Sequence, residues 1–127
     1  MAEELAGKKI LLVDDDKDIR AALQTALEDL GPEILVAADG NMAVELAESR
    51  EPDLVVLDMM LPKRSGFLVM EKLKRGKKPS DPPRIIMITG NKGIRHKAYA
   101  ESLGVDEYLN KPFPVEKLIE SVKKLLS

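Results

Sequence analysis

Side chains that can bind a metal ion or a phosphoryl group follow four short apolar segments of this chain. They are three carboxylates, a hydroxyl and an ammonium group, on Asp14, Asp15, Asp58, Thr89 and Lys111. In an open α/β sheet, ligands bind just beyond the carboxyl ends of the strands. If the four segments are parallel strands, these side chains converge on one crevice. Such a set would hold a hard cation together with a phosphoryl group.

The elements that must position these residues alternate between strand and helix. Short apolar runs bounded by turn-forming residues predict five strands, over residues 8–13, 33–37, 53–57, 84–88 and 106–110. Amphipathic spacing, capping residues and breakers predict five helices, over 16–30 (beginning at Asp16 or Asp18), 42–50, 66–75, 94–103 and 114–126. This alternation predicts an α/β fold with a doubly wound, five-stranded parallel sheet. We expect one domain over residues 8–127, preceded by a tail of residues 1–7.

Two groups of apolar side chains are expected to pack in or near the core. The buried stripe of the last helix is predicted to comprise Val115, Leu118, Ile119, Val122, Leu125 and Leu126. Methionines are expected to fill gaps rather than to act as ligands, at Met42, Met59, Met60, Met70 and Met87.

Composition bounds the classes of function. The chain has 127 residues, 44% of them hydrophobic and 33% charged, which fits a globular domain. A net charge of −2 gives no reason to expect nucleic-acid binding. The absence of cysteine excludes a disulfide scaffold and a thiolate metal site, and suits the cytoplasm. No apolar stretch approaches the roughly 20 residues of a membrane span, and no signal peptide is recognisable.

The three carboxylates are predicted to share one site. In a doubly wound sheet of order 2-1-3-4-5 the first and third strands are neighbours, so Asp14 and Asp15 would lie beside Asp58. Crowded carboxylates repel one another unless a cation compensates them, and an oxygen-only set favours Mg²⁺, with Mn²⁺ as a substitute. The alternative is that they are capping or solvated aspartates, as we expect for Asp16 and Asp18. Asp58 stands alone after a buried strand and is the best candidate for a phosphoryl-accepting nucleophile.

Lys111 and Thr89 each have an ordinary interpretation beside the functional one. A lysine at a strand end is usually solvated, and a β-branched threonine is common in strands. Opposite three carboxylates, both could instead contact phosphoryl oxygens. A cis peptide bond between Lys111 and Pro112 is a further expectation, because cis bonds are largely confined to proline.

Four segments together resemble the receiver domain of two-component response regulators. They are ILLVDDD, PDLVVLDMMLP, IIMITG and YLNKPF, in this order and at these spacings. The resemblance covers the chain from about Lys8 onward. It implies a flavodoxin-like fold with the strand order 2-1-3-4-5, and the order used above is informed by it.

The resemblance also implies roles. Asp58 would be the phosphoacceptor, with a sensor histidine kinase or a phosphotransfer protein as donor. Asp15 and Asp58 would bind Mg²⁺ directly, Asp14 would act mainly through water, and the backbone carbonyl of Met60 would complete the protein ligands. The phosphoryl group would be contacted by Thr89 and Lys111. Tyr108 would be the switch aromatic that turns inward on phosphorylation, so that the surface of the fourth helix, fifth strand and fifth helix changes for a partner.

Some positions depart from the family pattern or have no assigned role. Gly90 stands where the family usually has alanine, and Met60 and Asn91 occupy positions that tune dephosphorylation. A basic cluster within residues 72–78 is interpreted as a solvated surface in preference to a docking patch; it comprises Lys72, Lys74, Arg75, Lys77 and Lys78. His96, the single histidine, is expected on the surface.

Three functions are compatible with the residues. The leading one is a phosphorylation-controlled switch that is not an enzyme beyond its own phosphorylation and dephosphorylation. The second is a small phosphatase of the haloacid-dehalogenase type, although Asp58 would then have no role. The third is a phosphorylation-independent interaction module. The sequence leaves open the kinase, the downstream protein, and whether the chain is a monomer or a phosphorylation-linked dimer. It also leaves open whether the chain is complete or a domain cut from a longer protein.

Overall fold

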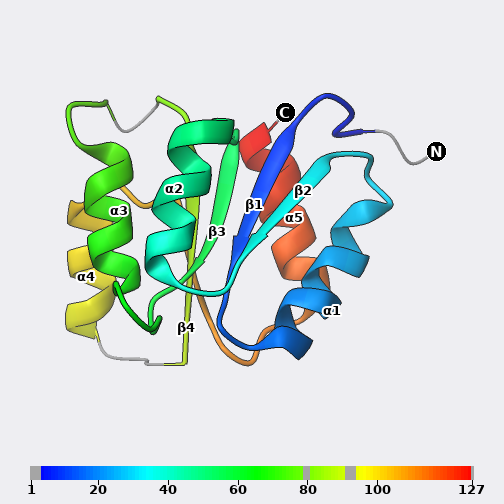
Figure 1. The fold of residues 1–127 in the computed structure, drawn as a ribbon. Coiled ribbons are helices and arrows are strands. Elements are labelled where there is room, and N and C mark those ends of the chain that lie inside the picture. The colour runs from blue at the N-terminus through cyan, green and yellow to red at the C-terminus, as the bar shows by residue number, and fades with distance from the viewer. Residues whose placement is uncertain (1–3, 79–80, 91–93, 127) are drawn as a thin grey trace.

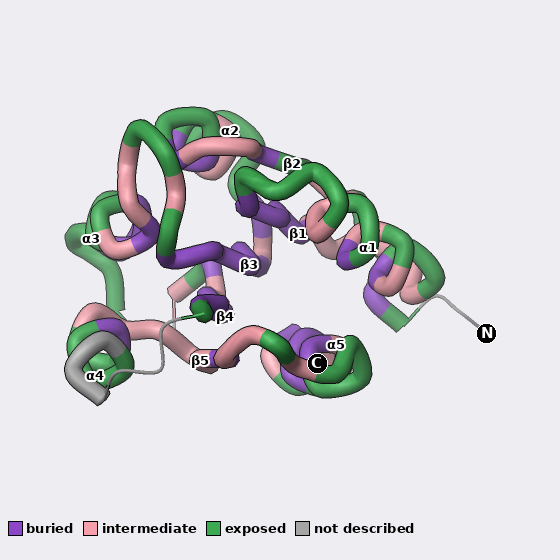
Figure 2. The backbone as a smooth tube through the Cα atoms, turned by 90° about the horizontal axis from the view of Figure 1, so that it is seen from below, coloured by how far each residue is buried: buried purple, intermediate pink, exposed green. Residues whose placement is uncertain are grey.

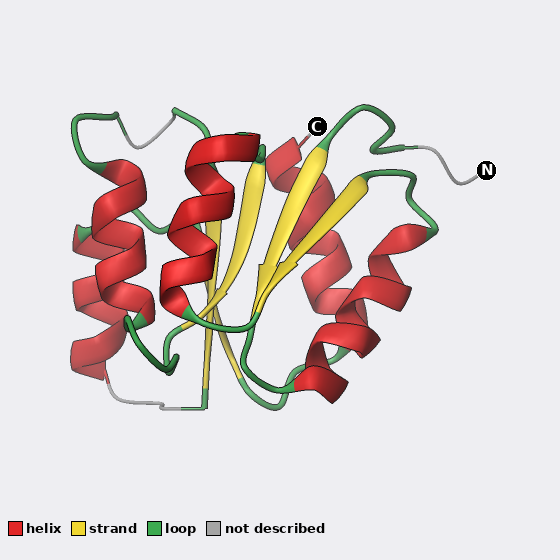
Figure 3. Cartoon of the chain, in the orientation of Figure 1, coloured by secondary structure: helices red, strands yellow, loops and turns green. Residues whose placement is uncertain are grey.

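The computed structural model describes residues 4–78, 81–90 and 94–126, without side-chain detail for residues 94–96. Strands and helices alternate along the chain (Figure 1; Figure 3). The strands are β1 (Lys9–Val13), β2 (Glu33–Ala37), β3 (Leu54–Asp58), β4 (Arg84–Thr89) and β5 (Glu107–Asn110). The helices are α1 (Lys17–Glu28), α2 (Gly40–Arg50), α3 (Gly66–Lys74), α4 (Ile94–Ser102) and α5 (Val115–Leu126). These elements confirm the predicted ones within about two residues at each end.

The sheet is parallel and has the order β2-β1-β3-β4-β5, as predicted. Its register decides what meets at the carboxyl edge. Val13 pairs with Leu57, so the residues that follow them, Asp14 and Asp58, lie side by side at this edge. Thr89 pairs with Asn110, which places Lys111 directly after the end of the neighbouring strand.

Helices cover both faces of the sheet (Figure 2). Helices α1 and α5 lie on one face, and α2, α3 and α4 lie on the other. Alternate residues of the strands face the two layers: Leu12 packs with the α1 and α5 side chains, whereas Leu11 packs with those of α2 and α3. Both are buried, as expected for a central parallel strand, which has no solvent face.

Helix N-termini are set by capping residues that the sequence only partly identified. Asp16, not Asp18, caps α1 by accepting hydrogen bonds from the amides of residues 18 and 19. Asp39 caps α2, which therefore begins at Gly40, two residues before the predicted start. Ser65 caps α3 by accepting from the amide of Leu68.

Three apolar residues expected in or near the core are exposed, so these predictions were wrong. Val115, in the first turn of α5, is 36% exposed, and Met42, in the first turn of α2, is 44% exposed. Met60 follows the end of β3 and is 67% exposed. All three lie near the carboxyl edge, where the strands have ended and no longer cover them. Met59, Met70 and Met87 are buried, as predicted.

Part of the N-terminal segment packs against the core where the structure describes it. Leu5 is buried in the core between the sheet, α1 and α5. Its amide donates to the carbonyl of Leu30 at 2.8 Å, and Glu4 forms an ion pair with Lys123 of α5 at 3.2 Å. Residues 1–3 lie outside the described part of the chain. None of the described helices combines the length and apolar character needed to cross a membrane.

We expect Leu5→Ala to lower the free energy of unfolding by about 2–4 kcal/mol, because it leaves a cavity in the core. Urea denaturation would measure this change. Leu68→Ala, at a leucine that is 53% exposed, is the matched control and should cost less than about 0.5 kcal/mol. Equal stability of Leu5→Ala and the original chain would show that the segment does not contribute to the core.

Candidate functional site

Three carboxylates meet at the carboxyl edge of the sheet. The side chains of Asp14, Asp15 and Asp58 each offer an oxygen, and these oxygens lie within 4.8 Å of one another. Asp14 and Asp58 are buried, whereas Asp15 is exposed. The site is therefore closed on the sheet side and open on the solvent side. The structure thus brings together the three residues that the sequence predicted to share a site.

Lys111 bridges the two buried carboxylates. Its Nζ lies 3.2 Å from Oδ2 of Asp14 and 3.4 Å from Oδ2 of Asp58. The lysine is held in place from the neighbouring strand, because its backbone amide donates to the carbonyl of Thr89 at 2.7 Å. The peptide bond from Lys111 to Pro112 is cis, as expected.

Backbone amides fix the other oxygen of each buried carboxylate. Oδ1 of Asp14 accepts from the amide of Asp16 at 2.9 Å, and Oδ1 of Asp58 accepts from the amide of Met60 at 3.0 Å. Each carboxylate thus has one oxygen tied to its own loop and one directed at Lys111. This arrangement orients both groups before any ligand binds, which reduces the reorganisation that binding requires.

The charges of the site are incompletely balanced. Burial raises the pKa of Asp58, and the nearby charge of Asp14 adds to this rise, although the Met60 amide and Lys111 oppose it. Burial by itself would lower the pKa of Lys111, but attraction to Asp58 and Asp14 outweighs burial and raises it. One ammonium group therefore does not fully compensate the buried carboxylates, and an added cation would stabilise their ionised forms.

The donor set fits a hard divalent cation. Carboxylate oxygens on an open edge suit Mg²⁺, which binds through a few carboxylates and keeps several of its waters. Asp15 and Asp58 are the residues expected to bind it directly, and Asp14 the one expected to act through water. Met60 is held beside Asp58 by its amide, and its side chain points away into solvent. The backbone carbonyl of Met60 remains the predicted third direct protein ligand.

The two residues assigned to switching lie on the strands beside the site. Thr89 ends β4 and is completely buried. Tyr108 is half-buried on β5 and packs against the core on the side of α2 and α3. Burial raises the pKa of its phenol.

The structure leaves room for a side chain at Gly90, because a Cβ there would meet nothing within 4 Å. Asn91 lies outside the described residues, and the side chain of His96 is not described.

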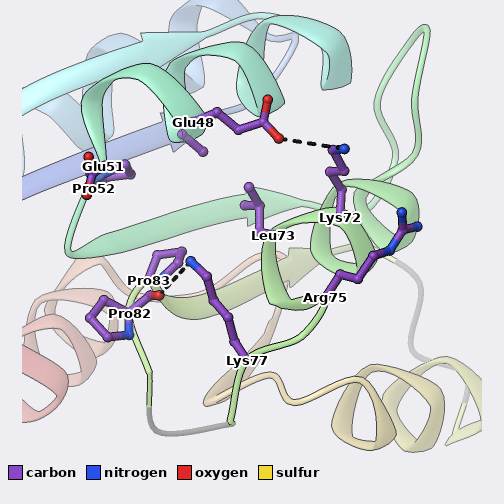
Figure 4. Close-up of a pocket in the computed structure, with 10 residues that line it drawn as sticks. Glu48, Glu51, Pro52, Lys72, Leu73, Arg75, Lys77, Pro82 and Pro83 are labelled. Carbon is purple, nitrogen blue, oxygen red and sulfur yellow. Dashed lines mark hydrogen bonds and ion pairs between the residues drawn. The ribbon is translucent and has the colours of Figure 1, made fainter.

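The basic cluster lies on the surface as predicted at Lys72, Arg75, Lys77 and Lys78, which are exposed, but not at Lys74. Lys74 is buried and its Nζ donates to the carbonyl of Asp81 at 2.7 Å, so its assignment to a solvated surface was wrong. Lys77 donates to the carbonyl of Pro82 at 3.2 Å, and Lys72 lies 3.7 Å from Glu48 of α2. Lys72 and Lys77 are among the residues that line a cavity of about 350 Å³, as Figure 4 shows. Lys74 and Lys77 hold the loop between α3 and β4, whereas Lys72 links α3 to α2.

Sequence reasoning missed a glycine that shapes the site. Gly66 begins α3 directly against the end of β3, and a Cβ there would lie 2.5 Å from the carbonyl oxygen of Asp58. Its amide donates to the carbonyl of Met59 at 2.9 Å. The available signal was a glycine at the start of a helix, where a better helix former would be expected without such a close approach.

Comparisons with known proteins agree on one family. A family model for the response regulator receiver domain matches residues 10–123. The chain is 41% identical over 123 residues to the probable transcriptional regulator ycf27 of Cyanophora paradoxa, covering 97% of this chain and 50% of that protein. It is 40% identical to the alkaline phosphatase synthesis transcriptional regulatory protein PhoP of Bacillus subtilis, covering 94% and 49%. The chain spans about half the length of these relatives.

Solved structures agree with the fold. A CheY-like receiver domain protein from Methanospirillum hungatei superposes with a TM-score of 0.86 at 30% identity, covering 94% of this chain and 93% of that one. The receiver domain of the Francisella response regulator 1452 gives a TM-score of 0.85 at 30% identity, covering 94% and 97%.

The raised pKa of Asp58 predicts a pH-dependent effect of Asp58→Asn on stability. A carboxyl group whose pKa is raised by folding binds its proton more tightly in the folded state, so stability falls as the pH rises through that raised pKa. The variant removes this cost. With a chelator present at about pH 7.5, we expect the melting temperature of Asp58→Asn to exceed that of the original chain by about 2–6 °C. This shift corresponds to a change of roughly 1 kcal/mol in the free energy of unfolding.

The difference should shrink at about pH 4.5, where more of Asp58 is neutral in the original chain. Thermal unfolding followed by circular dichroism measures both values. Asp16→Asn is the control, because asparagine caps α1 as well as aspartate does and Asp16 is exposed. A lower melting temperature for Asp58→Asn at the higher pH would contradict the account of the site.

Proposed function

We propose, because the chain belongs to the family of response regulator receiver domains, that it is a signalling switch controlled by phosphorylation of Asp58. A sensor histidine kinase or a phosphotransfer protein would supply the phosphoryl group. The observation that carries the proposal is the pair of buried carboxylates, Asp14 and Asp58, bridged by the ammonium group of Lys111. A site that only stabilised the fold would gain nothing from two buried like charges.

The geometry supports a direct transfer to Asp58. Its Oδ1 is held by the Met60 amide, which leaves Oδ2, on the side of Lys111, as the attacking oxygen. A new bond forms between this oxygen and phosphorus while the bond from phosphorus to the donor breaks, and the electron pair leaves with the donor. Lys111 and Thr89 would contact the transferred oxygens. Mg²⁺, when bound, would neutralise charge on the phosphoryl group.

The proposed output is a change of the surface formed by α4, β5 and α5. The backbone amide of Lys111 donates a hydrogen bond to the carbonyl of Thr89 at 2.7 Å. A phosphoryl group that contacts both side chains would therefore act on the ends of β4 and β5 together. Tyr108 is the switch aromatic on β5. A difference of roughly 1–3 kcal/mol between the two arrangements would suffice for signalling.

An apolar groove beside Lys111 supports docking of a phosphodonor protein. It has a volume of about 460 Å³ and is bordered by Ile19 and Leu23 of α1 and by Phe113 and Val115. The exposure of Val115, unexpected from the sequence, contributes to this groove. Apolar surface next to a reactive carboxylate fits a partner that must bring its own phosphorylated side chain to Asp58.

The downstream partner is a protein or output domain of unknown identity. One relative, at 39% identity, is named as the DNA-binding dual master transcriptional regulator RpaA of Synechocystis, and this chain covers 48% of it. Because this relative is named as DNA-binding, the comparisons do not support the expectation that the chain makes no direct contact with nucleic acid. We propose a cytoplasmic protein that contacts its target as a monomer or as a phosphorylation-linked dimer.

The two other functions fit less well. The relatives named above are regulators rather than classical enzymes. They therefore do not support a phosphatase of the haloacid-dehalogenase type. A phosphorylation-independent interaction module would not need Asp58, Thr89 and Lys111 together at the site.

Phosphorylation with a small donor tests the proposal. Incubation with acetyl phosphate and Mg²⁺ should add the mass of one phosphoryl group, as measured by intact-protein mass spectrometry. A chelator should abolish the adduct because the buried carboxylates then repel the donor. Asp58→Asn should form none, whereas Asp16→Asn, at a nearby exposed aspartate, should form it normally.

Rapid loss of the adduct would appear as release of phosphate, so both quantities are followed. If neither adduct nor phosphate release depends on Asp58, the chain is not a phosphorylated switch. Continuous turnover of a phosphate ester would indicate the phosphatase instead.

A further inference from the structure

The loop that carries Met60 is pinned against the first turn of α2. The amide of Gly40 donates to the carbonyl of Pro62 at 3.2 Å. A Cβ at Gly40 would lie 2.0 Å from the carbonyl oxygen of Arg64 and 2.5 Å from its Cβ. Real Cβ atoms essentially never approach a neighbour closer than 3.0 Å, so any side chain here would force the two backbones apart by about 1 Å.

A second contact lies beside the first. Oδ2 of Asp39 is 3.6 Å from Nζ of Lys63, while Oδ1 of Asp39 accepts from the amide of Met42 at 2.8 Å. That hydrogen bond lowers the pKa of Asp39, and the charge of Lys63 lowers it further. Lys63 has a φ of 67°, in the left-handed region. The loop therefore makes its most constrained turn where it meets α2. We name these residues of α2 and the loop the α2 clasp: Asp39, Gly40, Pro62, Lys63 and Arg64.

The other end of the loop is fixed to β3. The amide of Met60 donates to Oδ1 of Asp58, and the amide of Gly66 donates to the carbonyl of Met59. Met60 thus lies between the strand end, which carries the acceptor carboxylate, and the α2 clasp two residues later. The Met60 side chain is 67% exposed, so its backbone position is set by these anchors together with the packing of its neighbours, Met59 and Leu61, on the core.

We infer that the α2 clasp is a positioning element for the metal site: it holds the carbonyl of Met60 at the distance from Asp58 that a small divalent cation requires. This inference rests on the proposed function, in which that carbonyl is a ligand. Mg²⁺ accepts little deviation from bond lengths of about 2.0–2.1 Å, so a loop displaced by about 1 Å would lose the ligand. Packing between α2 and α3 does not need the clasp, because Val44, Val69 and Met70 already provide a buried contact there.

The first test is the affinity for Mg²⁺ of Gly40→Ala, measured by isothermal titration calorimetry. We expect the dissociation constant to rise at least about tenfold, which corresponds to roughly 1.4 kcal/mol. The control is Val44→Ala, one turn later in α2, which removes core packing in the same helix but alters none of the residues of the α2 clasp. Its dissociation constant should stay within about twofold of the original, although its melting temperature falls.

Two outcomes of this comparison would overturn the inference. One is unchanged Mg²⁺ affinity in folded Gly40→Ala. The other is an equal loss of affinity in Val44→Ala, which would assign the effect to general destabilisation.

Lys63→Gln gives a second test that does not depend on the folding of Gly40→Ala. Loss of a cation by itself would strengthen Mg²⁺ binding through electrostatics, whereas a loosened loop would weaken it. We expect about twofold weaker binding, since an exposed ion pair contributes little. Lys72→Gln removes an equivalent pair with Glu48, at 3.7 Å, away from the loop, and should bind Mg²⁺ as tightly as the original chain or slightly more tightly. Tighter binding by Lys63→Gln would overturn the inference.

Measurements on the original chain distinguish failure of the proposed function from failure of this inference alone. If it binds no Mg²⁺ and forms no adduct with acetyl phosphate, the proposed function fails and this inference fails with it. If it forms the Mg²⁺-dependent adduct at Asp58 while Gly40→Ala and Lys63→Gln bind Mg²⁺ normally, only the positioning role of the α2 clasp is wrong.

Discussion

Two buried carboxylates that share one ammonium group are the interaction around which the candidate functional site is built. Asp14 and Asp58 both contact Nζ of Lys111, at 3.2 and 3.4 Å, and both are nearly removed from solvent. Removing a carboxylate from water is costly unless opposite charge and hydrogen bonds compensate it. Here the compensation is partial, as the raised pKa of Asp58 shows. The protein thus keeps a site whose charge balance a bound cation would improve.

The parallel sheet enforces this arrangement. Strands β1 and β3 are paired so that Val13 lies opposite Leu57, and the next residue of each strand is a carboxylate. The buried strands β1 and β3 are held by packing on both faces of the sheet. Neither strand end can therefore move away to relieve the repulsion between the carboxylates. Lys111 arrives from β5 with its amide bonded to Thr89, which connects the charge balance of the site to the ends of β4 and β5. In the proposed function, a change at Asp58 would therefore reach first the strands that border α4 and α5.

The sequence predicted what depends on local pattern and strand order. Apolar runs located the strands, and their carboxyl ends located Asp14, Asp58 and Lys111 in one crevice, because parallel strands end at the same edge. Contacts that follow neither the helical or strand period nor the strand ends were beyond it. The burial of Leu5 depends on Leu30 and α5, and that of Lys74 on a carbonyl of the following loop. Neither contact has a periodic signal.

The most direct measurement is the pKa of Asp58, followed by carbon-detected NMR of its side-chain carboxyl group during a pH titration. In a chelator, the pKa should lie above the ordinary range for aspartate, because burial and the charge of Asp14 outweigh Lys111. Saturating Mg²⁺ should lower it markedly, since the bound cation favours the ionised form. An ordinary pKa that does not respond to Mg²⁺ would contradict the claim that the carboxylates form an under-compensated cation site.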